Sequence, residues 1–455
     1  MALSSSIVWE IQPGIGASTN GGGFVTGATG TDYSQQASPQ WEFVGVTTAG
    51  VDAILLHADA AATMIGNVAN IISGTNFTAG RYEILSVVAG VSITLDRDCA
   101  TGAGSDGVVK IGGAVASLKT IATTIVPGNK VYQKSTGTTD TFGSATTFTV
   151  GTYDLPILVE GYNLTRGDLS ALSYADSHTS DGFLIVTNYP TIAGATYTHV
   201  FGAYTFLYCL SLTSEKTNQG WGLGVSHRVK VINSANNASA YAASANGMSL
   251  FDCEFYSSGA ASYCAFSTLN VSQAVGCRFG SAAGHGVIDA YGWTYVNCTF
   301  YSIASGKAGI IVLDYRRSNT FVGCTFFNCD SGYKSAAGVT MTGYPTFINC
   351  QGTGCTTAFA NNVSDGPIPI RAVGNRLRNN GADYVGFIQS PASVGDISTA
   401  QTDAYEYVNP TASPPNLNLK PAGAGVGKGF GYSDIGSAQK KESIKLIGFS
   451  GGLNE

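Results

Sequence analysis

Asn297-Cys298-Thr299-Phe300 is one copy of a short motif that recurs along this chain. The second position of each copy is an anchor, which is cysteine in the clearest copies and is usually followed two residues later by phenylalanine. The anchors are 21 to 26 residues apart, with a mean spacing of 24. A period in the twenties with variable loops is typical of a solenoid, in which every repeat adds one turn. The anchors are Val159, Ile185, Cys209, Val231, Cys253, Cys277, Cys298, Cys324, Cys350 and Asn375.

Residues on either side of an anchor alternate as they do in a strand. Val296, Cys298 and Phe300 are two residues apart, so a straight strand places all three on the core face. Successive turns then pair in parallel about 4.8 Å apart. We therefore expect an all-β chain that forms a parallel β-helix of about ten or more coils.

A second aromatic series precedes the anchors by three residues and contains Tyr295, Phe321 and Phe347. These rings point away from the core if the strand is straight, and they would then suit an interface between subunits. If the strand bends before the anchor, the rings enter the core. Asparagines near the anchors are expected to form partial ladders whose amides satisfy turn backbone groups; they are Asn297, Asn328 and Asn349.

Composition supports strands over helices and excludes several classes of partner. Charged residues make up 11% of the 455 residues, glycine occurs 59 times, and the net charge is -6 with 23 Lys and Arg. No basic stripe is present, so nucleic acid is not an expected partner. No apolar run is long enough to span a membrane, and residues 1–7 lack the features of a secretory signal, so neither membrane association nor signal-dependent secretion is expected.

The ten cysteines suggest a metal site or disulfides at first, but six of them are anchors. The pairs Cys324/Cys329 and Cys350/Cys355 have the same spacing and are one repeat apart, which favours two ladders of buried thiols. No histidine is at ligand spacing from them. We expect no metal and no cofactor.

The chain divides into three regions by pattern. Residues 1–150 lack the repeat and contain short strands with Gly-rich turns, which predicts a β-rich N-terminal cap or docking region. Residues 151–385 carry the repeat and are expected to form the β-helix, and residues 386–455 a C-terminal capping segment. A cap is needed because an end coil exposes an unpaired strand edge.

The repeat resembles the right-handed parallel β-helix superfamily, which has the pectin-lyase-like fold. Residues 416–421 and 434–439 are similar to the closing motif of such chains, although Ser437 and Ala438 depart from its pattern. Residues 9–24 and 30–36 resemble the start of β-helix proteins from bacteriophages. The resemblance implies a virion spike, fibre or decoration protein.

The resemblance also implies that any chemistry lies on the outer face of successive coils. Asp289 and Asp314 precede neighbouring anchors by nine and ten residues, so they are the candidate catalytic pair, about 5 Å apart if they occupy adjacent rungs. Nearby residues are candidate glycan or subunit contacts, although two surface aspartates and an ion pair explain the pattern equally well. These candidates are Tyr291, Trp293, Tyr315, Arg316, Arg317 and Tyr344.

The leading hypothesis is a bacteriophage structural protein, a tail spike, tail fibre or capsid decoration protein, that contacts host surface glycans. We expect a homotrimer in the virion, assembled in the host cytoplasm, with residues 1–150 contacting other virion proteins and with bacterial surface polysaccharide as ligand. One alternative is a polysaccharide-degrading tailspike, a hydrolase or lyase. The other is a non-viral β-helix adhesin. The balance of these observations is against an enzyme.

Overall fold

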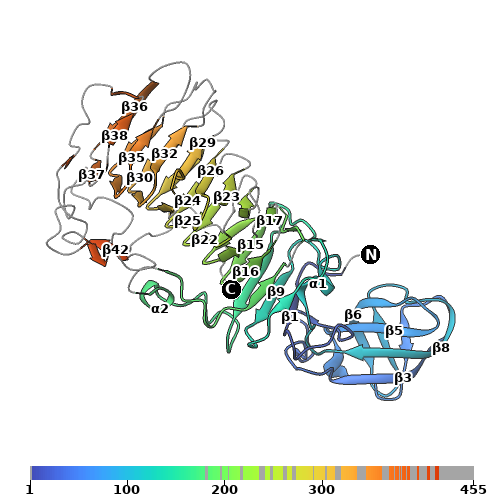
Figure 1. Ribbon diagram of the computed structural model, residues 1–455. Coiled ribbons are helices and arrows are strands. Elements are labelled where there is room, and N and C mark those ends of the chain that lie inside the picture. The colour runs from blue at the N-terminus through green and yellow to red at the C-terminus, as the bar shows by residue number, and fades with distance from the viewer. Residues whose placement is uncertain are drawn as a thin grey trace. The chain divides into compact units, whose positions relative to one another are not determined.

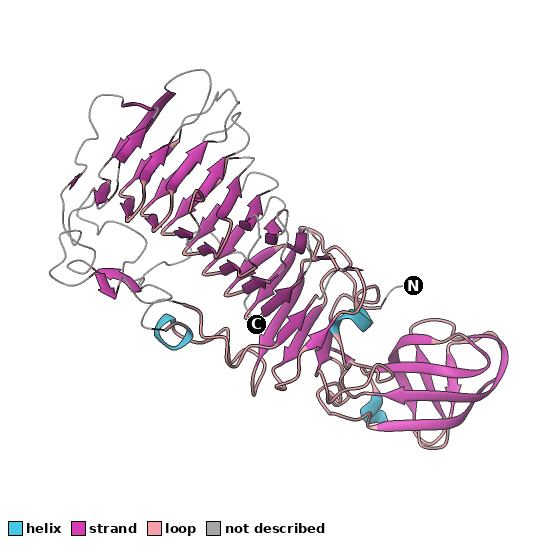
Figure 2. Cartoon of the chain, viewed as in Figure 1, coloured by secondary structure: helices cyan, strands magenta, loops and turns pink. Residues whose placement is uncertain are grey.

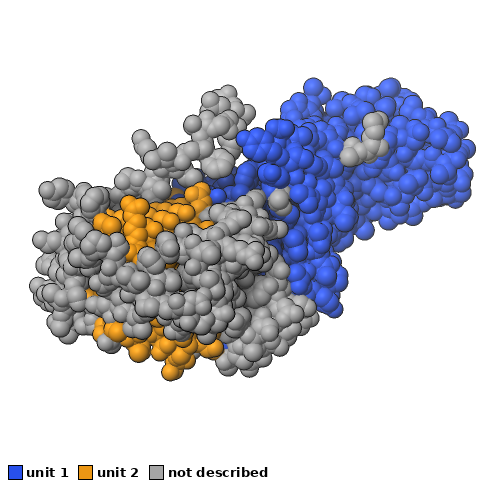
Figure 3. All heavy atoms as spheres, turned by 90° about the horizontal axis from the view of Figure 1, so that it is seen from above, with its two compact units in different colours: residues 1–171, 186–270 blue, residues 172–185, 271–455 orange. Residues whose placement is uncertain are grey.

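The structure is a computed structural model of the whole chain. It describes residues 3–179 without a gap and most of 183–389, where the longest gaps are 235–240, 313–318, 336–344 and 361–367. Beyond 389 it describes 397–398, 407–409 and 416–419. The chain forms two compact units, coloured separately in Figure 3: unit 1 contains residues 1–171 and 186–270, and unit 2 contains residues 172–185 and 271–455.

Unit 1 contains a closed antiparallel barrel of six strands (blue and labelled β3, β5, β6 and β8 in Figure 1). Its core is aliphatic and aromatic, with Val46, Leu55, Ile93 and Ile111 fully buried. Closure removes the exposed strand edges that an open sheet of this size would have. The strands are β3 (Trp41–Thr48), β4 (Ile54–Leu56), β5 (Val68–Phe77), β6 (Gly80–Val88), β7 (Ser92–Leu95) and β8 (Ala100–Ile111), with the 3-10 helix η1 (Ala62–Met64).

Unit 1 also contains turns of a parallel solenoid, and each turn contributes one strand to each of three sheets (Figure 2). Sheet 1 begins with the antiparallel β2 (Gly23–Val25) and continues through β1 (Ile7–Ile11), β9 (Lys130–Lys134), β12 (Ile157–Tyr162), β15 (Thr205–Tyr208), β18 (Val225–His227) and β21 (Ser249–Phe251). Sheet 2 holds β10 (Asp140–Thr141), β13 (Thr191–Ala193), β16 (Ser211–Ser214), β19 (Lys230–Asn233) and β22 (Glu254–Ser257). Sheet 3 holds β11 (Thr146–Thr147), β14 (His199–Val200), β17 (Gln219–Leu223), β20 (Tyr241–Ala245) and β23 (Cys264–Thr268). Helix α1 (Leu118–Ile121) precedes β9.

Unit 2 repeats the three-sheet arrangement and begins with helix α2 (Tyr174–Ser177). Its sheet 1 strands are β24 (Gln273–Val275), β27 (Thr294–Val296), β30 (Thr320–Val322), β33 (Thr346–Ile348), β36 (Ile368–Val373) and β39 (Phe387–Gln389). Its sheet 2 strands are β25 (Arg278–Ser281), β28 (Thr299–Ser302), β31 (Thr325–Phe327), β34 (Gln351–Thr353), β37 (Arg376–Arg378) and β40 (Ile397–Ser398). Its sheet 3 strands are β26 (His285–Asp289), β29 (Ala308–Val312), β32 (Ser331–Ser335), β35 (Thr357–Ala360) and β38 (Ala382–Val385), and β41 (Tyr407–Asn409) pairs with β42 (Asn416–Leu419).

The predicted all-β solenoid is confirmed, but it has about seven turns and not ten or more. Ile185, counted as an anchor, is in no strand and follows α2. Strands β10, β11 and β14 have two residues each, so the first turns are incomplete. The parallel pairing also includes β1 and β9, which precede residue 151. The three region boundaries predicted from the sequence stay predictions, and most of 386–455 is outside the described residues.

A left-handed residue bends the chain between sheet 1 and sheet 2. Asn297 has φ 51° and Gly323 has φ 62°, a conformation that Asn and Gly adopt more easily than other residues. The prediction that Val296, Cys298 and Phe300 share the core face is therefore wrong for Val296, which is only partly buried on the outer side of the bend. The same corner conformation occurs at Cys209, Arg228, Asp252, Gly276 and Asn349.

The bend places the second aromatic series in the core. Tyr295, Phe321 and Phe347 are fully buried, and their rings stack with centroids 5.2 and 4.9 Å apart. Phe300 and Phe326 form a parallel stack at 5.1 Å. Of the two alternatives from the sequence, the core position is correct and the intersubunit face is not.

The cysteines form buried columns beside these rings. The nine cysteines whose side chains are described are all buried. Cys324 interacts with Cys298 and Cys350 on the neighbouring turns, and burial raises its pKa well above the ordinary value. Cys329 interacts with Cys355 in the same way. The two predicted ladders are therefore present.

Asparagine amides connect neighbouring turns near the anchors. Asn375 accepts a hydrogen bond from the Cys350 backbone N–H at 2.8 Å, and its Nδ2 donates to the Phe347 carbonyl at 3.2 Å. Asn380 accepts from the Cys355 N–H in the next column. These amides satisfy the backbone at corners where the sheet hydrogen bonds are interrupted.

Candidate functional site

The predicted catalytic pair is only partly within the described residues. Asp289 is the last residue of β26, and the register aligns it with Val312 of β29. Asp314 follows two residues after Val312, outside the described residues. The register therefore does not place the two aspartates on one rung by strand pairing, and their separation of about 5 Å stays a prediction.

Among the predicted glycan or subunit contacts, Trp293 is the one whose side chain is described. It is fully buried, and its ring stacks on Tyr295 with centroids 6.1 Å apart. The prediction of a surface contact is wrong for Trp293, because the corner bend at Asn297 turns this part of the chain inward. The other predicted contacts are outside the described residues; they are Tyr291, Tyr315, Arg316, Arg317 and Tyr344.

The structure instead aligns polar and aromatic side chains on the outer face of sheet 1 in unit 1. The register pairs Glu10 with Tyr132, Tyr132 with Glu160, Glu160 with Tyr208, and Tyr208 with His227. The residues just before them in each strand face inward and are buried, as Val131, Val159 and Leu207 show. Because side chains alternate along a strand, the aligned set faces outward. We call Tyr132, Glu160, Tyr208 and His227, with Glu10 at the end, the outer column.

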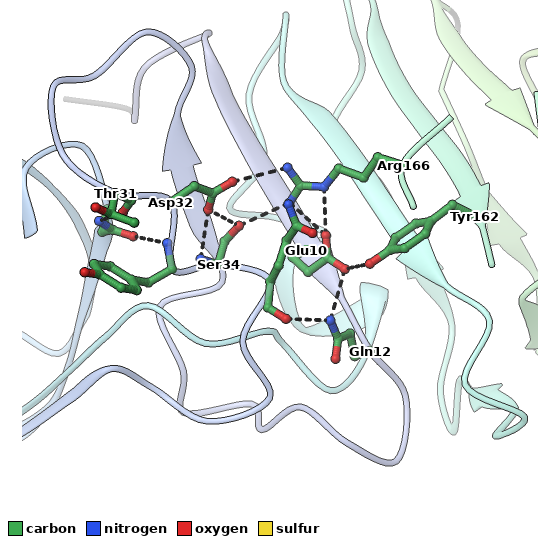
Figure 4. Close-up of polar contacts among 10 residues, drawn as sticks. Glu10, Gln12, Thr31, Asp32, Ser34, Tyr162 and Arg166 are labelled. Carbon is green, nitrogen blue, oxygen red and sulfur yellow. Dashed lines mark hydrogen bonds and ion pairs between the residues drawn. The ribbon is translucent and has the colours of Figure 1, made fainter. Parts of the chain in front are cut away.

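Glu10 is closed off by its neighbours, as Figure 4 shows. Its side chain is fully buried, and Arg166 donates to Oε2 from Nη2 at 2.7 Å and from Nε at 3.0 Å. Tyr162 and Gln12 donate to the other oxygen. Burial raises the pKa of Glu10, while the Arg166 charge and these hydrogen bonds oppose the rise.

Arg166 belongs to the loop after β12, and this loop is held on both sides. Its Nη1 is 3.3 Å from Asp32 Oδ2, and Nη2 also donates to Ser34. Its guanidinium lies over the Tyr132 ring, 4.8 Å from the centroid. Asp168 accepts hydrogen bonds from backbone N–H groups at 163–165, which lower its pKa against the effect of burial. The loop therefore has a defined conformation beside the outer column.

Glu160 is the carboxylate of the outer column that is in no ion pair with another described residue. Its Oε1 accepts a hydrogen bond from Ser170 Oγ. Burial raises the pKa of Glu160, the Asp168 charge adds to the rise, and Ser170 and Lys130 oppose it. Glu160 is 8% exposed, and the hydrogen bond from Ser170 uses one of its two carboxyl oxygens, so the other oxygen retains acceptor capacity.

His227 ends the column beside an acidic residue and an aromatic ring. Its Nε2 is 4.0 Å from Asp252 Oδ2, and its ring meets Tyr208 edge-on at 5.6 Å. Burial lowers the pKa of His227 to about 4, although Asp252 acts in the opposite direction. At neutral pH the imidazole is therefore uncharged and can both donate and accept hydrogen bonds.

The distance between the carboxyl groups of Glu10 and Glu160 can be compared with that of a catalytic pair in a glycosidase. They are two strands apart, about 9.6 Å by strand spacing, which is near the upper limit of about 9.5 Å for the carboxyl pair of an inverting glycosidase. However, one Glu10 oxygen accepts hydrogen bonds from Arg166 and the other accepts them from Tyr162 and Gln12. The Glu10 side chain is also fully buried. Glu10 is therefore a structural ion-pair partner, and the outer column is suited to binding.

The outer column could not be predicted from the sequence, because its members come from distant segments of the chain. Glu10 and Tyr132 are brought together by pairing of β1 with β9 across the inserted barrel. The available signal was the alternation in Val159-Glu160-Gly161-Tyr162, where polar residues alternate with small or apolar ones. Across the described residues, no cluster of three or more His, Cys, Asp and Glu side chains has metal-binding geometry, and no described helix is long and apolar enough to span a membrane.

No family model matches the sequence, and no curated protein matches it. Among solved structures, pectate lyase Pel9A is 14% identical with a TM-score of 0.47, over 72% of this chain and 92% of that one. The tailspike protein gp49 from Pseudomonas phage LKA1 is 11% identical with a TM-score of 0.22, over 81% of this chain and 64% of that one. The catalytic domain of GH87 alpha-1,3-glucanase is 10% identical with a TM-score of 0.20, over 86% and 95%. All three scores are below 0.5, so the assignment of a parallel β-solenoid stands on the strand pairing itself.

Proposed function

We propose that this protein is a β-helical structural protein of a bacteriophage particle, a tail spike, fibre or decoration protein, that binds polysaccharide on the bacterial surface. The observation that carries the binding role is the outer column, in which Tyr132, Glu160, Tyr208 and His227 repeat at the strand spacing of about 4.8 Å. Aromatic rings with carboxyl and imidazole groups between them offer both stacking faces and hydrogen-bond partners to a sugar polymer. The solenoid holds these groups on paired backbone, so little side-chain or loop ordering is needed on binding.

The virion role is supported by the resemblance of residues 9–24 and 30–36 to the start of phage β-helix proteins. The separate barrel at 41–111 supports it as well, because it adds a folded module that the solenoid does not need for its own pairing. A module of that kind can attach the solenoid to a particle. In this proposal the protein is a homotrimer in the virion.

A binding assay on whole bacteria tests the polysaccharide role. Fluorescently labelled protein is added to strains that carry different surface polysaccharides, before and after mild periodate oxidation of the sugars. We expect binding to at least one strain and its loss after oxidation. Binding that persists after periodate but is lost after protease treatment of the cells would contradict the proposal. Immunogold labelling of particles then separates tail from head.

The alternative hypothesis, a polysaccharide-degrading tailspike, has its own test. Release of reducing sugar from the bound polysaccharide, abolished by Asp289→Ala or Asp314→Ala, would support a polysaccharide-degrading spike. Absence of release with every polysaccharide that binds would exclude it.

A further inference from the structure

Three aromatic side chains occupy alternate positions at β15: Tyr204 is in the turn just before the strand, and Phe206 and Tyr208 are on its outer face. Tyr204, Phe206 and Tyr208 alternate with Thr205 and Leu207, which are buried. Tyr204 is 43% exposed, and Phe206 and Tyr208 are partly buried. Phe206 and Tyr208 are two strand residues apart, about 6.6 Å along β15. We call these three residues the aromatic strip.

An exposed tyrosine extends the aromatic strip at its first residue. Tyr153 is 83% exposed, and its ring meets Tyr204 edge-on with centroids 6.4 Å apart. The turn that carries Tyr153 is fixed by the backbone N–H of Thr152, which donates to the Leu155 carbonyl at 3.0 Å. A large ring exposed to this degree and held by a neighbour is available for stacking at little entropic cost.

The backbone at Tyr204 is strained. Its φ of 56° is uncommon for a bulky residue, whereas glycine adopts it readily. The Tyr204 ring is exposed to solvent, so the strained backbone does not serve to pack this ring into the core. A strained and exposed aromatic residue is the pattern expected of a binding site.

The charge of this surface narrows the class of ligand. The strip and the segments that contain its two flanking strands have no Lys or Arg; these are residues 204–208, 150–162 and 225–227. They contain Asp154, which is exposed and makes no hydrogen bond or ion pair with the described residues, and Glu160. Lys130 on β9 is opposite Leu158 on β12, and its positive charge opposes the rise in the pKa of Glu160 that burial causes. A polyanion is recognised through cationic side chains, which these three ranges lack.

We infer that the aromatic strip with Tyr153 and Asp154 binds a neutral saccharide chain that runs along β15, parallel to the strands of sheet 1. The inference rests on the proposed function and adds to it the ligand class and the direction of the chain. Sugar rings stack on Tyr153, Tyr204 and Tyr208, and the exposed carboxylate of Asp154 accepts hydrogen bonds from sugar hydroxyls. Polymers of uronic acids or sulfated sugars are excluded by charge repulsion.

Affinity electrophoresis of the full chain tests this inference, with dextran, laminarin and yeast mannan as neutral polymers and polygalacturonate and alginate as polyanions. We expect retardation by at least one neutral polymer and by neither polyanion. Tyr153→Ala and Tyr208→Ala should each weaken binding about tenfold. Tyr197→Ala is the matched control, because Tyr197 is also exposed, at 40%, but precedes β14 and is not on sheet 1. Asp154→Lys should introduce binding to polygalacturonate.

Each other outcome overturns the inference in a distinguishable way. Retardation by a polyanion alone would contradict the ligand class while leaving the proposed function intact. Neutral binding that survives both tyrosine substitutions, in variants with unchanged thermal melting, would place the site elsewhere. Dissociation of an oligomer by Tyr153→Ala, seen by analytical ultracentrifugation, would make this surface a subunit interface. No retardation by any polymer, together with no binding to bacterial cells, would overturn both the inference and the proposed function.

Discussion

The carboxylate of Glu10 and the guanidinium of Arg166 form a buried ion pair between the first strand of the chain and a loop 156 residues later. Arg166 Nη2 is 2.7 Å from Glu10 Oε2, and the Arg166 side chain is 19% exposed. The pair joins β1 to the loop after β12, and β1 supplies the end of the outer column. The ion pair therefore connects the N-terminal strand to the candidate binding surface.

Loss of Arg166 should destabilise the protein strongly. In Arg166→Met the Glu10 carboxylate stays buried without its cation, so we expect a decrease in the free energy of unfolding of about 3–5 kcal/mol. Chemical denaturation followed by tryptophan fluorescence measures it, because Trp9 is adjacent to Glu10 and fully buried. The double variant Glu10→Gln/Arg166→Met should recover part of the loss.

Lys110→Ala is the matched control for this ion pair. Lys110 pairs with Glu42 at 3.1 Å, but the Glu42 side chain is 57% exposed, so its loss should cost at most about 1 kcal/mol. Equal effects of the two substitutions would show that the Glu10–Arg166 pair contributes no more than a surface pair.

Acid should destabilise the solenoid through a buried histidine in sheet 3. His285 Nδ1 accepts a hydrogen bond from the Ala308 backbone N–H at 2.9 Å, and burial lowers its pKa from 6.5 to about 4, helped by Lys307 and Lys334. Below pH 6.5 the unfolded chain binds a proton that the folded chain does not, so stability falls as pH decreases from 6.5 to 4. The full effect is about 3 kcal/mol.

The substitution His285→Asn tests this assignment, because its Oδ1 can replace Nδ1 as acceptor without titrating. Denaturation midpoints between pH 7 and pH 4 should depend less on pH in the variant. An identical pH dependence in both proteins would refute the role of His285.

The buried thiol columns should be chemically inert in the folded protein. Burial raises the pKa of Cys324 and Cys329 well above the ordinary value, so the reactive thiolate is nearly absent at neutral pH. Iodoacetamide followed by peptide mass spectrometry should leave both residues unmodified in the native protein and label them in urea. Rapid labelling of Cys324 in folded protein would contradict the core position.

The corner conformation predicts an unusual order of substitutions at Asn297. Because φ is 51° there, Asn297→Gly should be close to neutral, whereas the β-branched Asn297→Val should cost about 1–3 kcal/mol. Thermal melting measures both. Thr294→Val on the exposed side of β27 is the control and should change stability by less than about 0.5 kcal/mol. A milder effect of valine than of glycine at 297 would exclude the left-handed corner.

The sequence by itself determined the solenoid and the burial of its cysteines. The cross-section of one turn sets how many residues return the chain to the same sheet, so Cys298, Cys324 and Cys350 recur at a fixed spacing. Only the tertiary structure decided which residues near each cysteine in the sequence point into the core with it. A single left-handed residue such as Asn297 redirects the chain, and so Trp293 and Tyr295 are buried while Val296 is not.

The candidate site depended still more on the tertiary structure. Glu10, Tyr132, Glu160 and Tyr208 are aligned by strand register, and register follows from loop lengths and from the barrel inserted between β2 and β9. A sequence period reports that turns repeat, but it does not report which residues of different turns are opposite one another. For that reason Asp289 is aligned with Val312, while the aromatic strip on β15 is visible only once the strands are paired.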